Sequence, residues 1–250
     1  MLNQIAENVY YMNFSTETDR PCLGYIRGTE RSMMVDSGNS PEHVDLFLKE
    51  LDEMGLPYPE LVFITHHHWD HTFGMAAIKE RTGALTIVGE RTNAILRSMR
   101  GYTWDMEHFD EYVADNRIPL FCRPHILLEY PDLKGIDVRE GDIVFEGDLS
   151  VALGGETVRM RRIASSHTDE CYILYTENTG VLFLGDSYSQ EVIGDKWYDH
   201  KDKLFEQVAQ LREIPFEKAL PGHGELYTKE GLIKELLDRS EVADYMVYTI

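Results

Sequence analysis

The sequence predicts an α/β fold in which helices pack outside β-sheets. Two observations support this prediction. Short β-rich segments alternate with segments of helical periodicity, and this alternation occurs in both halves of the 250 residues. No stretch has the composition of a linker or of low-complexity sequence. A single domain covering residues 1–250 is therefore expected.

In the N-terminal third, a helix and a buried strand are the clearest elements. Ser40 suits an N-cap and Pro41 the first helical position. Apolar residues then recur at helical spacing as far as Gly55, a natural stop. The apolar run Leu61 to Thr65 fits a buried strand. The other elements expected here are strands at 9–14, 22–26, 32–36 and 84–88 and a helix at 75–81.

The second half repeats this alternation of strands and helices. The elements expected there are strands at 136–145, 149–153, 157–163, 171–175 and 181–184 and helices around 204–211 and 232–237. Residues 97–134 break the pattern, with aromatic side chains among charges and three prolines. This stretch is interpreted as a helical, aromatic insertion that covers the active site, makes a homodimer contact, or packs as a peripheral subdomain.

Composition excludes several classes of partner. The formal net charge is −20, from 44 acidic and 24 basic residues, and such a surface repels nucleic acid and anionic membranes. No apolar run approaches the roughly 18 residues that a membrane span needs, and the first ten residues do not form a secretory signal. Three scattered cysteines argue against a disulfide framework. A cytoplasmic protein that acts on a small molecule is expected.

The strongest chemical signal is the run from Thr65 to His71, directly after the apolar strand. It contains four side chains that can bind a metal within six residues: His66, His68, Asp70 and His71. Imidazole nitrogens and carboxylate oxygens suit zinc. Burying so many ionisable groups together is unfavourable unless a cation compensates them. The run therefore predicts a metal site at the end of this strand.

These four residues match the H-x-H-x-D-H motif of the metallo-β-lactamase superfamily, which the chain resembles along nearly its whole length. The family's other motifs follow its order, at Val35-Asp36-Ser37-Gly38, Ser165-Ser166-His167-Thr168, Leu184-Gly185-Asp186 and Pro221-Gly222-His223-Gly224. The resemblance implies a four-layer αβ/βα sandwich with the metal site at one edge. It also implies that Asp36 lies beneath the metals and supports their ligands.

The resemblance further implies a metal-dependent hydrolase with two divalent metal ions. The first ion would be bound by His66, His68 and His167. The second would be bound by Asp70, His71 and His223, with Asp186 bridging both. A hydroxide shared by the two ions would attack an ester, lactone, thioester or related acyl bond, and Asp70 would orient it and shuttle a proton.

The metal and the substrate are less tightly specified. The family's di-iron branch usually has Glu at the position of His68, so the histidine here favours zinc over iron. Iron and manganese stay as alternatives, because histidine and carboxylate ligands bind them too. The β-lactam-cleaving branch with the H-x-H-x-D pattern has Cys where this chain has Asp186, which argues against that activity. The glyoxalase II and lactonase branch shares all seven ligands. Tyr188, two residues after Asp186, is assigned either a catalytic role on a substrate carbonyl or a packing role.

Three alternatives to an acyl hydrolase stay open. One is an iron-dependent redox enzyme of the same fold, similar to a persulfide dioxygenase or to the di-iron proteins. Another is a phosphodiesterase or nuclease, which the acidic charge disfavours. The last is an inactive scaffold that keeps the fold. His67 lies between two ligands and is expected to point away from the metals.

Overall fold

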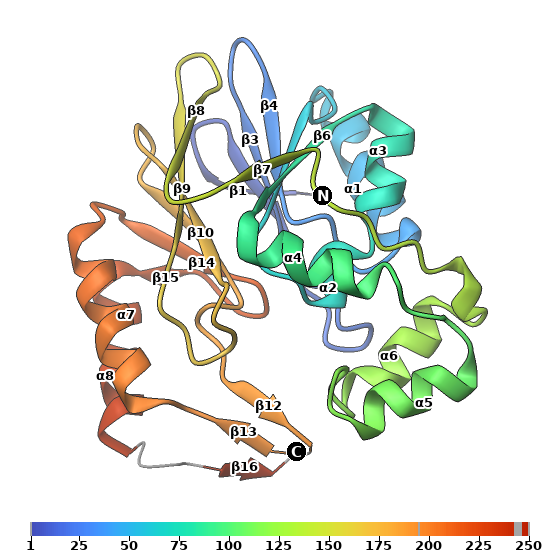
Figure 1. Cartoon of the computed structure of the whole chain (residues 1–250). Coiled ribbons are helices and arrows are strands. Elements are labelled where there is room, and N and C mark those ends of the chain that lie inside the picture. Colours follow the sequence, from blue (N-terminus) through green and yellow to red (C-terminus); the bar gives the residue numbers. More distant parts are fainter. Residues whose placement is uncertain (1, 195, 243–246, 250) are drawn as a thin grey trace.

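Two β-sheets face each other in the computed structural model, which describes residues 2–194, 196–242 and 247–249 (Figure 1). The first sheet has seven strands in chain order: β1 (Asn3–Ala6), β2 (Val9–Met12), β3 (Leu23–Arg27), β4 (Ser32–Val35), β5 (Leu61–Ile64), β6 (Leu85–Gly89) and β7 (Ile143–Phe145). The second runs in the order β15 (Tyr227–Thr228), β14 (Lys218–Pro221), β11 (Val181–Gly185), β10 (Tyr172–Thr176), β9 (Thr157–Arg162) and β8 (Leu149–Ala152).

Helices cover the outer face of each sheet (Figure 1). The first sheet carries α1 (Pro41–Met54), α3 (Met75–Thr82) and α4 (Glu90–Met99), and the short α2 (Trp69–Thr72) follows β5. The second sheet carries α7 (Lys201–Glu213) and α8 (Lys229–Val242). A small third sheet consists of β12 (Glu191–Ile193), β13 (Lys196–Tyr198) and β16 (Val247–Thr249). The predicted αβ/βα sandwich is confirmed.

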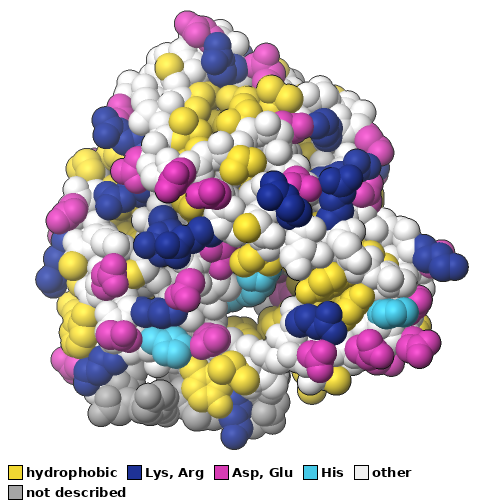
Figure 2. All heavy atoms as spheres, viewed as in Figure 1, with side chains coloured by type: hydrophobic (Ala, Val, Ile, Leu, Met, Phe, Trp, Pro, Cys, Tyr) yellow, Lys and Arg dark blue, Asp and Glu magenta, His cyan; other side chains and the backbone are white. Residues whose placement is uncertain are grey.

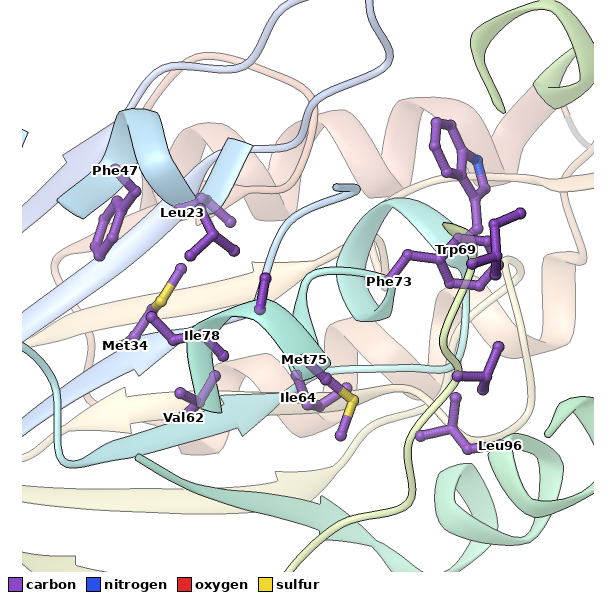
Figure 3. Packing of buried hydrophobic residues seen from close by; sticks show 14 of the residues in the cluster. Leu23, Met34, Phe47, Val62, Ile64, Trp69, Phe73, Met75, Ile78 and Leu96 are labelled. Atoms are coloured by element: carbon purple, nitrogen blue, oxygen red, sulfur yellow. The ribbon is translucent and has the colours of Figure 1, made fainter. Parts of the chain in front are cut away.

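Three apolar clusters join the four layers. Phe47 of α1 and Ile78 of α3 pack against Met34 and Val62 on the outer face of the first sheet (Figure 3). A second cluster lies between the sheets and includes Phe63 and Phe183. The third joins the second sheet to α7 and α8. Each sheet is therefore buried on both faces, which explains its continuous apolar runs.

The predicted boundaries of α1 are confirmed. The Oγ atom of Ser40 accepts a hydrogen bond from the backbone N–H of His43 at 3.2 Å, which satisfies one of the free donors of the first turn. Gly55 ends the helix with φ of 65°, a left-handed conformation that glycine adopts without steric cost.

The strand expected at 136–145 is shorter than predicted, because only β7 belongs to a β-ladder. Ile136 and Val138 point into the first core cluster, which gives the segment a strand-like alternation. Residues 140 and 141 bind helix α4: the Gly141 N–H donates to Asn93, and Glu140 pairs with Arg97. Asp142 binds Thr86 of β6 through its side chain and its N–H, without ladder pairing. Neither α4 nor the hairpin β12–β13 was expected from the sequence.

Residues 97–134 hold the end of α4 and two further helices, α5 (Met106–Ala114) and α6 (Cys122–Glu129), followed by a 3₁₀ turn at Leu133–Gly135. Phe109, Tyr112 and Ile126 are buried and continue the first core cluster. Both of these helices lie wholly within this stretch. Among the described residues, no helix is long and apolar enough to cross a membrane.

Candidate metal centre

The seven predicted ligands come together at one edge of the sandwich, where several strands end. β5 leads into the segment with His66, His68, Asp70 and His71. The other three ligands lie in the segments that follow β9, β11 and β14 of the second sheet, in which β11 and β14 are neighbours and β10 separates β9 from β11. β11 and β14 run parallel, so Asp186 and the His223 loop emerge at the same edge. The motifs, scattered over more than 150 residues of sequence, therefore meet in space through the strand order.

His66, His68 and His167 form the first ligand group. Nε2 of His167 lies 2.8 Å from Nδ1 of His68, and the ring centroids of His66 and His68 are 4.7 Å apart. The Nδ1–H of His167 donates to the carbonyl oxygen of Gln190 at 2.8 Å. That bond occupies Nδ1, so Nε2 is free to bind a metal.

Asp70, His71, Asp186 and His223 form the second group. One carboxylate oxygen of Asp70 lies 3.0 Å from Nε2 of His71 and 2.9 Å from Nε2 of His223. The Oδ2 atom of Asp186 lies 3.7 Å from both His223 and His167. Asp186 thus contacts both ligand groups, as the bridging position requires.

The donor atoms fit divalent cations. Nε2 of His66, Nε2 of His71 and Oδ1 of Asp186 are buried and make no hydrogen bond with any described residue. Leaving buried polar atoms without partners costs free energy, and a cation bound to their lone pairs removes that cost. The two groups offer three and four ligands, all imidazole or carboxylate, a donor set typical of zinc, iron or manganese.

The two groups differ in their electrostatics. Burial lowers the pKa of His66 and His68 well below the ordinary value, and neighbouring imidazoles add to this. These side chains are therefore neutral and ready to bind a metal. In the second group, burial opposes protonation of His223, but Asp186 and Asp70 raise its pKa to about 9. A cation bound there replaces the proton that now balances the carboxylates.

Two glycines allow the close packing behind the ligands. A Cβ atom on Gly222 would overlap Oδ1 of Asp186 and approach the ring of His71. Gly185 has φ of 51°, and a Cβ there would overlap the side chain of Thr65. Glycine is needed at both positions because the backbone of one ligand segment touches the side chains of another.

Three positions flanking the ligands have clear contacts. The Tyr188 hydroxyl bonds to Glu235 and, at 3.0 Å, to Tyr227, and its ring packs with the α7–α8 cluster, which favours its packing role. His67 forms an ion pair with the buried Glu170 and does not belong to either ligand group.

Glu170 and Gln190 were not predicted from the sequence, because they lie outside the family motifs.

The insertion reaches across the site to the hairpin β12–β13. The side chain of Asn116 accepts a hydrogen bond from the Gly194 N–H at 3.0 Å and donates one to the Val192 carbonyl at 3.5 Å. Phe121, just before α6, lies 5.3 Å from Trp197 between ring centroids. Figure 2 shows the surface hollowed between these two regions, with a histidine side chain at the upper rim. The insertion and hairpin therefore frame the access to this side of the molecule.

The fold and the paired ligand groups define a protein with an αβ/βα sandwich and two His/Asp groups that could hold metal ions. The model of the metallo-beta-lactamase superfamily matches residues 23–223, and the chain belongs to that superfamily. No curated protein matches the sequence significantly.

Solved structures with the same fold cover nearly the whole chain. A metallo-beta-lactamase from Pontibacter korlensis shares 17% identity with a TM-score of 0.66, covering 95% of this chain and 97% of its own. DIM-1 metallo-beta-lactamase shares 13% identity (TM-score 0.65, 98% of each chain). A metallo beta lactamase from Hirschia baltica also shares 13% (TM-score 0.60, 96% and 97%). At these identities the similarity shows the fold alone.

Proposed function

We propose that this chain is a metal-dependent hydrolase that cleaves an ester, lactone, thioester or related acyl bond of a small molecule. The observation that supports it most is the position of Asp186, whose carboxylate lies within 3.7 Å of His167 in one ligand group and His223 in the other. A carboxylate shared by two ligand groups is what a two-metal hydrolytic site requires.

The proposed ligands are His66, His68 and His167 for one ion and Asp70, His71 and His223 for the other, with Asp186 shared. Bound divalent cations supply Lewis acidity and the means to activate water near neutral pH. Asp70 is the proposed proton carrier: one of its oxygens already contacts His71 and His223, and it is buried at the ligand cluster. Asp36 and Gln190 hold the imidazoles of His71 and His167 in the orientation needed.

Zinc is the proposed metal, because neutral imidazoles and carboxylates bind it well and His68 takes the place of the Glu usual in the di-iron branch. The solved relatives are β-lactamases by name, but this chain has Asp186 where the β-lactamase branch with the H-x-H-x-D pattern uses Cys. The proposed substrates are therefore acyl compounds other than β-lactams.

A hydrolysis screen with purified, zinc-loaded protein tests this proposal. It includes an ester, a lactone, a thioester, a phosphodiester and a β-lactam, each before and after chelation. We expect chelator-sensitive cleavage of an acyl substrate, restored by zinc, and loss of that cleavage in Asp70→Asn. Cleavage of the phosphodiester alone, or no hydrolysis of any substrate by the zinc-loaded protein, would contradict it.

A further inference from the structure

The first ligand group is assembled from two segments of chain that follow strands of different sheets. His66 and His68 follow β5 of the first sheet, and His167 follows β9 of the second. The two sheets face each other (Figure 1). Three imidazoles can bind one ion only if their nitrogens meet at about 2 Å from it. The group therefore needs a firm connection between the two segments, close to the ligands.

A side-chain pair makes this connection. Glu170 lies three residues after His167 in the sequence. It accepts a hydrogen bond from the Nδ1–H of His67, the residue between the ligands His66 and His68. The same carboxylate oxygen is 3.4 Å from the backbone nitrogen of His67. The side chain of Glu170 is buried and that of His67 is largely buried, so water competes little with this bond.

Two further hydrogen bonds keep the pair in register. The Tyr172 N–H donates to the Thr65 carbonyl at 2.8 Å, which joins the two segments through their backbones. The Thr92 hydroxyl of α4 donates to the Glu170 carbonyl at 3.3 Å. On each segment the Glu170–His67 pair lies two residues from the backbone bond, on the side of the ligands. It therefore extends the connection between the sheets towards the metal centre.

We infer that Glu170 is a positioning residue for the first ligand group. By fixing His67, it holds His66 and His68 at the separation from His167 at which the three can bind one ion. Glu170 and His67 are not members of either ligand group, so they act on the metal through the backbone of the ligands. The inference goes beyond the proposed hydrolase function, because it concerns metal binding and holds for any bond that the site cleaves.

The effect should be confined to the first group, because the second has its own support. His71 is fixed to the end of β4 by three hydrogen bonds. Its carbonyl accepts from the Ser37 N–H at 3.0 Å and from the Ser37 hydroxyl at 2.8 Å, and its Nδ1–H donates to Asp36. Loss of the Glu170–His67 pair leaves all three in place.

Zinc affinity measured separately at each group tests the inference without hydrolysis. Two backgrounds isolate the groups: His223→Ala removes a ligand of the second, and His68→Ala removes one of the first. Competition with a chromophoric zinc chelator gives the affinity of the ion that remains. Adding Glu170→Met keeps the approximate size of the side chain but removes the acceptor. It should weaken zinc binding about 10- to 100-fold in His223→Ala and leave it unchanged in His68→Ala.

Two variants separate positioning from a general loss of stability. Glu156 is buried at the opposite end of β9, where its carboxylate accepts hydrogen bonds from the backbone of residues 178 and 179. Glu156→Met is therefore the matched control and should keep the affinity of the first group. His67→Leu combined with Glu170→Met leaves neither partner buried and unpaired, so its free energy of unfolding should stay near that of the wild type. It should lose zinc affinity as Glu170→Met does.

The outcomes distinguish this inference from the proposed function. Unchanged affinity of the first group in Glu170→Met or in the folded double variant, an equal loss at both groups, or the same loss in Glu156→Met would overturn the inference. A wild type that binds no zinc would overturn it together with the assignment of the ligands. If the affinity of the first group depends on Glu170 but no acyl substrate in the screen is cleaved, the inference holds and the hydrolase function is contradicted.

Discussion

His71 donates a hydrogen bond from Nδ1 to Oδ2 of Asp36 at 2.7 Å, and both side chains are buried. Asp36 also accepts the backbone N–H of Thr65 at 2.8 Å, so it joins the end of β4 to the ligand segment after β5. The bond fixes Nε2 of His71 as the atom that faces Asp70 and Asp186.

Replacing Asp36 with Asn should weaken metal binding at the second ligand group by about 10- to 100-fold. Asparagine keeps an acceptor and tolerates the φ of 60° at this position, but it lacks the negative charge that polarises His71. Competition with a chromophoric zinc chelator measures the loss. Asp45→Asn is the control, because Asp45 of α1 forms only a surface ion pair with Arg81 of α3. Equal affinities in both variants would refute this role of Asp36.

Gly222→Ala should displace Asp186 and lower both metal content and activity. The added methyl group would overlap Oδ1 of Asp186, and that carboxylate belongs to a buried cluster with little room to move. Gly135→Ala is the matched control, because a Cβ there meets only Tyr130, at an ordinary 3.6 Å. Metal analysis and an acyl hydrolysis assay compare the two. Full metal content in Gly222→Ala would show that the close approach is not needed.

Much of this site could be predicted because its ligands form motifs that follow strands. The run from His66 to His71 is compact in sequence, and each later ligand comes after an apolar segment. Gln190 and Glu170 could not be found in the same way. Their positions depend on tertiary contacts: the Gln190 backbone carbonyl accepts from His167, and the Glu170 side chain pairs with His67.

The same contrast applies to the fold. The alternation of apolar residues identified most strands and the helix periodicity identified α1, α7 and α8. The alternation of apolar residues wrongly predicted a strand at residues 136–142. Ile136 and Val138 are buried there in the first core cluster, without pairing to a neighbouring strand. Hydrophobic alternation reports burial of every second side chain, and a β-ladder is only one way to achieve it.

His43 should make the metal-free protein less stable in mild acid. Burial lowers its pKa to about 3, and Arg20 and His71 add to this, whereas the unfolded chain titrates near 6.5. Between these values the unfolded state binds more protons, so the free energy of unfolding falls as pH drops below 6.5. Relative to His43→Leu, the wild type should lose about 2 kcal/mol between pH 7.5 and 5.0 in urea unfolding.

His108→Leu is the control for that experiment. The hydrogen bond that the His108 ring donates to the Asp105 carboxylate raises the pKa of this exposed histidine, so its contribution is present at low pH and is lost as pH rises through the folded pKa. The wild type should therefore gain, not lose, stability relative to His108→Leu on acidification. The same direction for both variants would contradict the assignment to His43.

Asn116→Gly should loosen the contact between the insertion and the hairpin β12–β13. Glycine tolerates the φ of 55° but removes both hydrogen bonds to residues 192 and 194. The Gly194 amide should then exchange with solvent up to about tenfold faster, the equivalent of one hydrogen bond. Asn8→Gly, at a φ of 58° in the β1–β2 turn, is the matched control. Unchanged exchange at Gly194 would show that Asn116 does not hold the hairpin.

Metal content tests the central claim most directly. The wild type and His68→Ala are each incubated with zinc, passed through a desalting column, and analysed for metal per chain. With two ligand groups, the wild type should retain about two zinc ions and His68→Ala about one, because the variant keeps the second group intact. A wild type that retains no metal would contradict the metal centre, and one that retains a single ion would contradict its dinuclear character.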